Sequence, residues 1–296
     1  MMPDFASRFV GAQDGLKLHV RCYAAATKSH RLPVICLPGL ARTGADFHRL
    51  ALALSGDTSR PRQVFALDYR GRGRSDYDPD PANYNVAVEL NDVLTVLAAL
   101  AVERAVFIGT SRGGILTMLL AATGSKIVAG AVLNDIGPVV ELQGLLRIKS
   151  YVGKLPQPAN FEEAGEMLRQ LFAAQFTSLA PADWTAFAQR TFEERDGKLV
   201  PSYDRALAQT LAAFEGDQPF PPLWSQFDAL AGVPLMVIRG QNSDLLSPST
   251  VAAMRQRRPD LVFAEVAGQG HAPLLAEDDI IAQICDFVAS CDSSPT

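Results

Sequence analysis

Short apolar runs recur along this chain between longer amphipathic segments, and each run ends at a turn that carries Gly or Asp. Runs this short suit strands that are buried on both faces, and the amphipathic segments between them suit crossover helices. The alternation therefore predicts a mainly parallel sheet in an α/β fold. The predicted strands of this kind cover residues 33–37, 63–67, 104–108, 129–133, 233–238 and 261–266.

A hairpin is predicted ahead of these strands. The apolar segments 9–10 and 16–22 flank Asp14-Gly15, a turn dipeptide typical of antiparallel hairpins. The sheet should then hold about eight strands, with this hairpin at its edge. A length of 296 residues allows two ordinary domains or one large α/β domain with an insertion.

The regular alternation stops after Pro138 and resumes at Val233. The interval shows no convincing strand, but it has several helical patterns that prolines separate. Because predicted strands flank the interval on both sides, we expect one core domain, 1–138 and 226–296, with a helical cap at 139–225 inserted after the sixth strand. The helical patterns cover residues 142–152, 161–176, 181–194 and 203–214.

The strongest chemical signal is the pentapeptide Gly109-Thr110-Ser111-Arg112-Gly113, which follows a predicted strand and opens a helical pattern. A serine in such a turn is held in a strained backbone geometry that only small neighbours tolerate. The turn also lifts the hydroxyl clear of the sheet at a helix N-terminus. The pattern predicts Ser111 as a nucleophile rather than as a serine that only caps the helix.

A serine nucleophile needs a general base, which is usually a histidine. Of the four histidines, only His271 follows a core strand, in the glycine-bearing loop 268–273. Active sites of open α/β sheets form at that edge, so His271 is the predicted base.

Two aspartates could orient that histidine. Asp244 follows the strand at 233–238, and Asp135 follows the strand at 129–133. Both satisfy the chain order nucleophile, acid, histidine. We favour Asp244, because it follows the strand immediately before that of the histidine and a Gly-bearing turn places it. Asp135 is the alternative acid, or else a hydrogen-bond acceptor at the base of the insertion.

Acyl transfer also needs hydrogen-bond donors for the oxyanion. We expect the backbone N–H groups of Arg112 and of Leu40, because Leu40 lies in the turn after the third strand, where Gly39 permits a sharp bend. A further loop, Asp68 to Ser75, is rich in arginine. A network that stiffens the turn together with Asp68 is a better interpretation of these arginines than anion binding.

Taken together, these motifs resemble the α/β-hydrolase superfamily, in particular its lid-bearing esterases, lactonases and C–C hydrolases, over nearly the whole chain. The resemblance implies the α/β-hydrolase fold, with Ser111 as nucleophile, His271 as base and Asp244 as acid. Two departures stand out. Pro38 occupies a position where many members have His, and Arg112 stands where Met or Gln is common.

The position of Arg112 suggests that an arginine near the nucleophile binds a negative group on the substrate. Arg112, Arg42 and the cap residue Arg147 are the candidates, and the alternative is a salt bridge to Asp46, Asp135 or Glu215. Among the apolar and aromatic residues predicted in the cap, Tyr151 and Trp184 are candidates for the substrate pocket. Most such residues belong to the cap core instead, since apolar residues at helical spacing usually do.

The expected activity is hydrolysis of a small carboxylic ester or lactone through an acyl-enzyme. A C–C bond hydrolase of a ketone-type substrate and a perhydrolase would keep the same triad. A ligand receptor without catalysis is the alternative outside enzymes.

Composition excludes other classes. The chain has 48% hydrophobic and 20% charged residues and a formal net charge of −5, which argues against disorder and against nucleic-acid binding. No apolar run reaches the roughly 20 residues of a membrane span. No Cys/His pattern indicates a metal site, and no cofactor is expected. Without a visible secretory signal, a cytoplasmic location is expected, and the oligomeric state stays open.

Overall fold

The computed structural model describes residues 4–212 and 220–293. Its main sheet has eight strands in the order β1-β2-β4-β3-β5-β6-β9-β10. β1 pairs antiparallel with β2 and β2 with β4, and all other neighbours are parallel. The prediction of a mainly parallel, eight-stranded sheet with an edge hairpin is thus confirmed. The strands are β1 (Ala6–Gly11), β2 (Lys17–Tyr23), β3 (Val34–Leu37), β4 (Val64–Leu67), β5 (Ala105–Thr110), β6 (Val128–Asn134), β9 (Leu235–Gly240) and β10 (Val262–Val266).

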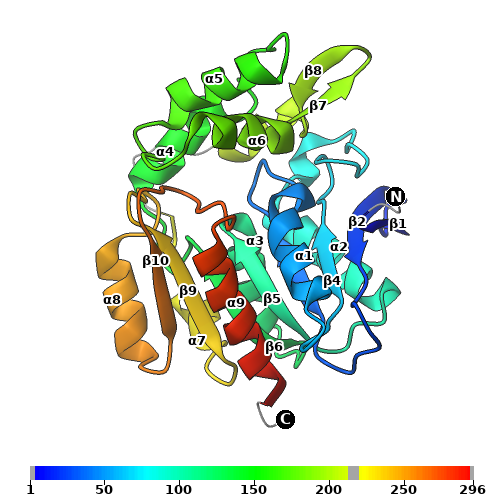
Figure 1. Ribbon diagram of the computed structural model, residues 1–296, viewed down its shortest axis with the longest axis vertical. Coiled ribbons are helices and arrows are strands. Elements are labelled where there is room, and N and C mark those ends of the chain that lie inside the picture. Colours follow the sequence, from blue (N-terminus) through cyan, green and yellow to red (C-terminus); the bar gives the residue numbers. More distant parts are fainter. Residues whose placement is uncertain (1–3, 213–219, 294–296) are drawn as a thin grey trace.

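Helices cover both faces of the sheet, as parallel strands with apolar side chains on both faces require (Figure 1). One apolar cluster includes α1 (His48–Gly56) and α9 (Asp278–Ser290). A second cluster, on the opposite face, includes α2 (Val86–Ala99), α3 (Arg112–Ala122), α7 (Trp224–Asp228) and α8 (Pro248–Arg257). Short 3-10 helices η1 (Gly44–Phe47), η2 (Pro81–Asn83) and η4 (Cys291–Ser293) complete this part.

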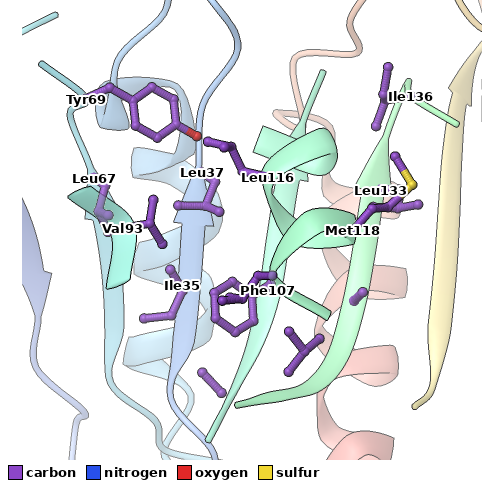
Figure 2. Packing of buried hydrophobic residues seen from close by; sticks show 14 of the residues in the cluster. Ile35, Leu37, Leu67, Tyr69, Val93, Phe107, Leu116, Met118, Leu133 and Ile136 are labelled. Atoms are coloured by element: carbon purple, nitrogen blue, oxygen red, sulfur yellow. The ribbon is translucent and has the colours of Figure 1, made fainter. Parts of the chain in front are cut away.

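The second cluster positions the helix that follows Ser111. Figure 2 shows Phe107 of β5 and Leu133 of β6 beside Leu116 and Met118 of α3. All four side chains are almost completely buried. Burying a Leu, Phe or Met side chain stabilises the fold by about 1.5–3 kcal/mol. The turn between β5 and α3 is therefore anchored on both sides.

A separate group of elements lies between β6 and β9. We call it the cap: α4 (Leu142–Tyr151), α5 (Phe161–Phe172), α6 (Pro181–Thr191), β7 (Phe192–Arg195), β8 (Lys198–Pro201) and the 3-10 helix η3 (Arg205–Leu211). The cap stands at one end of the sheet (Figure 1) and has an apolar cluster of its own, which includes Trp184 and Phe187. Residues 139–225 stay our predicted bounds for it.

The cap differs from the sequence prediction in detail. The helix predicted at 161–176 ends at Phe172, and the one at 181–194 ends at Thr191, where the hairpin β7–β8 begins. In place of the helix predicted at 203–214, the structure has the 3-10 helix η3 at Arg205–Leu211. Residues 213 and 214 of the prediction lie outside the described part of the chain. The expectation that the cap holds no strand was wrong, because Asp196-Gly197 turns the chain back with positive φ at both residues. Among the described residues, no helix combines the length and apolar character needed to cross a bilayer.

Candidate active site

Ser111 stands in the turn between β5 and α3. Its backbone has φ 51° and ψ −111°, which is a strained conformation for a residue with a side chain. The glycines around it are needed for space: a Cβ at Gly113 would lie 2.0 Å from the carbonyl oxygen of Leu37, and one at Gly109 would lie 2.5 Å from the backbone of Gly113. The close packing fixes the hydroxyl at the N-terminus of α3, where the helix dipole favours negative charge.

His271 meets this hydroxyl from the loop after β10. Its Nε2 lies 2.9 Å from Ser111 Oγ, although 160 residues separate the two in the chain. Gln175 of the cap supports the loop, because its Oε1 accepts a hydrogen bond from the His271 backbone N–H at 3.3 Å. The structure therefore brings together the two residues that the sequence predicted as nucleophile and base.

The carboxylate that contacts His271 belongs to Asp135. Its Oδ2 lies 2.8 Å from His271 Nδ1, and the Asp135 side chain is completely buried. Two donors hold it: the N–H of Gly240, the last residue of β9, at 2.7 Å, and the hydroxyl of Ser243 in the turn after β9, at 2.5 Å. A carboxylate on Nδ1 keeps the proton there, so Nε2 is free to accept the serine proton. We did not predict that Ser243 would hold the acid. Its position next to Asp244, in the turn after a core strand, was the one signal for it.

Asp244 was the wrong choice for the partner of His271. Its two carboxylate oxygens accept hydrogen bonds from Arg147 of α4, at 2.6 and 2.8 Å. Burial, the largest single influence, would raise the pKa of Asp244, but the hydrogen bonds and charge of Arg147, together with Gln175 and His271, lower the pKa below its ordinary value of 3.8. Arg147, one of the arginines predicted to contact substrate, lines neither of the two cavities at Ser111 that are described below. Its ion pair with Asp244 joins the loop after β9 to the first helix of the cap.

We expect the variant Arg147→Gln to unfold more easily, because it leaves a half-buried Asp244 carboxylate without its partner. The expected loss is about 1–3 kcal/mol in the free energy of unfolding at neutral pH. Since the folded-state pKa of Asp244 is lowered, this stabilisation is present above pH 3.8 and disappears as the pH falls further. Urea unfolding of both proteins at several pH values measures it. A stability difference that grows on acidification would contradict this account.

The other predicted arginines also have protein partners. Arg112 Nε lies 3.4 Å from the carboxylate of Glu89, which is fully buried and also pairs with Arg72 at 2.6 Å. Neither Asp46 nor Asp135, two of the alternatives expected for the arginines, contacts Arg112. The third alternative, Glu215, lies outside the described residues. Arg42 does pair with Asp46, through two hydrogen bonds of 2.7 and 2.5 Å.

The arginine-rich loop after β4 forms a structural network, as expected, though Asp68 is not the partner of its arginines. Arg70 pairs with Asp14, Asp78 and Asp92 instead. Asp68 accepts hydrogen bonds from the backbone N–H groups of Gly44 and Arg74 and contacts His19 at 2.7 Å. These contacts stiffen the loop, and Arg72 links it to the site by donating a hydrogen bond of 2.8 Å from Nε to the carbonyl oxygen of Leu40.

Two cavities meet at Ser111. The inner cavity, of about 110 Å³, lies beneath the cap and includes His271, Arg42 and Tyr151 in its wall. The outer groove, of about 500 Å³, includes Arg112 and the η3 segment of the cap. Leu40, one of the two expected oxyanion donors, lines both, and Arg112 lines the groove. Gly39 brings this turn close, since a Cβ there would lie 3.8 Å from Ser111 Cβ.

The two aromatic residues proposed for the pocket differ in position. Tyr151 lines the inner cavity, together with Phe172, Phe176 and Phe187. Trp184 lines neither cavity; it is 4% exposed and packs against Phe176 and Phe187 in the cap core. Trp184 as a substrate contact was therefore wrong. Among the described residues, no cluster of His, Cys, Asp and Glu side chains could hold a metal ion.

Comparison with known proteins supports the fold class of the chain. A family model described as "Alpha/beta hydrolase family" matches residues 34–284. The chain is 34% identical to a 3-hydroxybutyrate-oligomer hydrolase of Cupriavidus necator, over 84% of this chain and 85% of the relative. It is 27% identical to a 2-(acetamidomethylene)succinate hydrolase of Mesorhizobium japonicum, over 79% of each. The crystal structure of an alpha/beta hydrolase from Novosphingobium aromaticivorans is 39% identical, with a TM-score of 0.90 over 98% of this chain and 99% of the other.

Proposed function

The chain belongs to the alpha/beta hydrolase family, and from that premise we propose that it cleaves a small carboxylic ester through a Ser111–His271–Asp135 triad. The observation that carries the proposal is the unbroken hydrogen-bonded line of 2.9 and 2.8 Å from the serine hydroxyl through the imidazole to a buried carboxylate. In that order the three groups are suited to generate a serine nucleophile at neutral pH.

The mechanism follows from this line. As the Ser111 oxygen attacks the carbonyl carbon, its proton passes to His271 Nε2, and Asp135 stabilises the resulting imidazolium. The backbone N–H groups of Arg112 and Leu40 hold the oxyanion, each contributing about 3–4 kcal/mol. His271 then gives its proton to the departing alkoxide. A water molecule, activated by the same histidine, releases the acid from Ser111.

For the substrate class we propose esters of short hydroxy acids, including their linear oligomers. The relative from Cupriavidus necator, named for its action on 3-hydroxybutyrate oligomers, supports this choice because the alignment spans most of both chains. The mainly apolar wall of the inner cavity suits a short carbon chain.

The proposal is tested by acid release from ethyl butyrate, a four-carbon lactone and the linear dimer of 3-hydroxybutyrate, recorded by titration at constant pH. We expect turnover of the two open-chain esters and inactivation by a fluorophosphonate with one label per chain. Labelling of Ser111 without hydrolysis of any of the three would contradict an ester hydrolase. It would favour C–C bond cleavage, to be assayed next on a ketone-type substrate, or a receptor.

A further inference from the structure

The two cavities extend from Ser111 in different directions. Both share Leu40 and Ile148 in their walls, but the inner cavity alone contains His271 and the segment 272–275 after it. The outer groove alone contains Arg112 and Ile115 of α3. The two halves of a bound ester can therefore occupy two distinct spaces.

The position of the base decides which half goes where. The imidazolium formed on attack must donate its proton to the departing oxygen, which requires that oxygen within hydrogen-bond reach of His271 Nε2. Because His271 belongs to the wall of the inner cavity and not of the groove, the alcohol half lies in the inner cavity. The acyl chain takes the remaining direction, along the groove past Arg112.

The inner cavity also carries charge in an otherwise aromatic wall. Arg42 and Asp46 both line it, and Arg42 donates a further hydrogen bond of 2.6 Å to Thr191 while its guanidinium lies 4.7 Å from the Phe187 ring centre. A second guanidinium, Arg190, approaches the same Asp46 carboxylate at 3.8 Å.

Asp46 is the carboxylate that acts on Arg42, and it divides its charge between Arg42 and Arg190. Asp183 and Glu277 act on Arg190 as well, but neither lines the inner cavity. Asp46 and the two arginines are each about one-fifth to one-quarter exposed, so water screens this charge only partly. Burial, the largest single influence, would lower the pKa of Arg42, but Asp46 together with Tyr151 and Tyr203 raises it, so Arg42 stays charged. An anionic group entering the inner cavity would complete the balance.

Resting on the proposed ester hydrolysis, we propose that the alcohol half of the substrate is a hydroxy acid whose free carboxylate binds Arg42 in the inner cavity, while the acyl half lies in the outer groove. Hydrolysis breaks the bond between the acyl carbon and the hydroxy acid's oxygen, and that oxygen takes the proton from His271. Water supplies the hydroxyl of the released acyl acid. On an oligomer, the enzyme therefore removes units from the carboxylate end.

Two pairs of matched esters test the orientation. In the first pair, 3-acetoxybutyrate is compared with its primary amide, so the charge lies on the alcohol half. In the second, monoethyl succinate is compared with ethyl succinamate, so the charge lies on the acyl half. We expect the wild type to favour the charged member of the first pair by about 10- to 100-fold in kcat/KM, and to show no such preference in the second.

Variants locate the cation. Arg42→Gln is expected to bring the charged-to-neutral ratio of the first pair close to one. Arg190→Gln is expected to lower it as well, because Asp46 then balances Arg42 alone. Arg195→Gln removes a charge from an exposed cap residue that pairs with Glu193 outside both cavities, and should keep the wild-type ratio. Thermal unfolding of each variant checks that it is folded. If Arg42→Gln does not fold, the ratio measured with Arg190→Gln tests the proposal in its place.

The outcomes separate the two proposals. A wild type that hydrolyses the neutral esters but favours the charged acyl half, or folded variants that keep the wild-type ratio, would overturn the orientation and leave ester hydrolysis intact. A wild type that hydrolyses none of the four esters would overturn ester hydrolysis itself, and the orientation with it.

Discussion

Replacing Asp135 by Asn is expected to lower kcat by about 10⁴-fold while the protein stays folded. An amide is close in size to the carboxylate, but it can offer its NH₂ to the imidazole and favour the tautomer with the proton on Nε2. His271 could then no longer accept the proton of Ser111, which lies 2.9 Å away. Steady-state hydrolysis of ethyl butyrate measures the change, and circular dichroism checks the fold.

Asp244→Asn is the matched control, because it alters the other strand-end aspartate. Asp244 pairs with Arg147 rather than with the imidazole. We therefore expect this variant to keep kcat within about tenfold of the wild type and to lose stability instead. A fast Asp135→Asn enzyme beside a dead Asp244→Asn enzyme would show that the acid was assigned to the wrong strand.

Removing the nucleophile should have the largest effect. Ser111→Ala is expected to lower kcat by about 10⁶-fold, because without the oxygen no acyl-enzyme forms and only binding and the oxyanion donors remain. The variant should also take up no fluorophosphonate, which intact-mass spectrometry detects. Ala is smaller than Ser and introduces no steric clash, so the fold should persist.

Ser125→Ala provides the control for this experiment, since Ser125 is exposed after the C-terminal end of α3 and lines neither cavity. It should label and turn over like the wild type. Retained labelling of Ser111→Ala at one adduct per chain would mean that another side chain is the reactive nucleophile.

The sheet was predictable because its central strands are buried on both faces. Val34–Leu37 and Val64–Leu67, for example, are apolar throughout, and every side chain in them is buried. The cap was harder, because its elements are short and half-exposed. The strands β7 and β8 have four residues each, and β7 has one buried residue, so the hairpin is too short to give a clear strand pattern. Its Asp196-Gly197 turn was the one local signal for it.

The meeting of Ser111 and His271 was predictable because each follows a strand of the sheet in a glycine-bearing turn. The acid was not, because two aspartates met the same criterion and chain order did not separate them. What separates them is tertiary. Gly240 and Ser243 point their donors at Asp135, whereas an arginine more than 90 residues before Asp244 draws that side chain toward the cap. Nothing in the local sequence encodes the second contact.

His271 and Asp135, which share a hydrogen bond, are 136 residues apart in the chain, so they are synthesised at different times. A ribosome adds about 5–20 residues per second, so the base is synthesised about 7–27 s after the acid. The whole cap is made in that interval. Each nascent molecule thus carries Ser111 and Asp135 before His271 exists, and on the proposed mechanism we expect hydrolysis to begin only after β10 has joined the sheet.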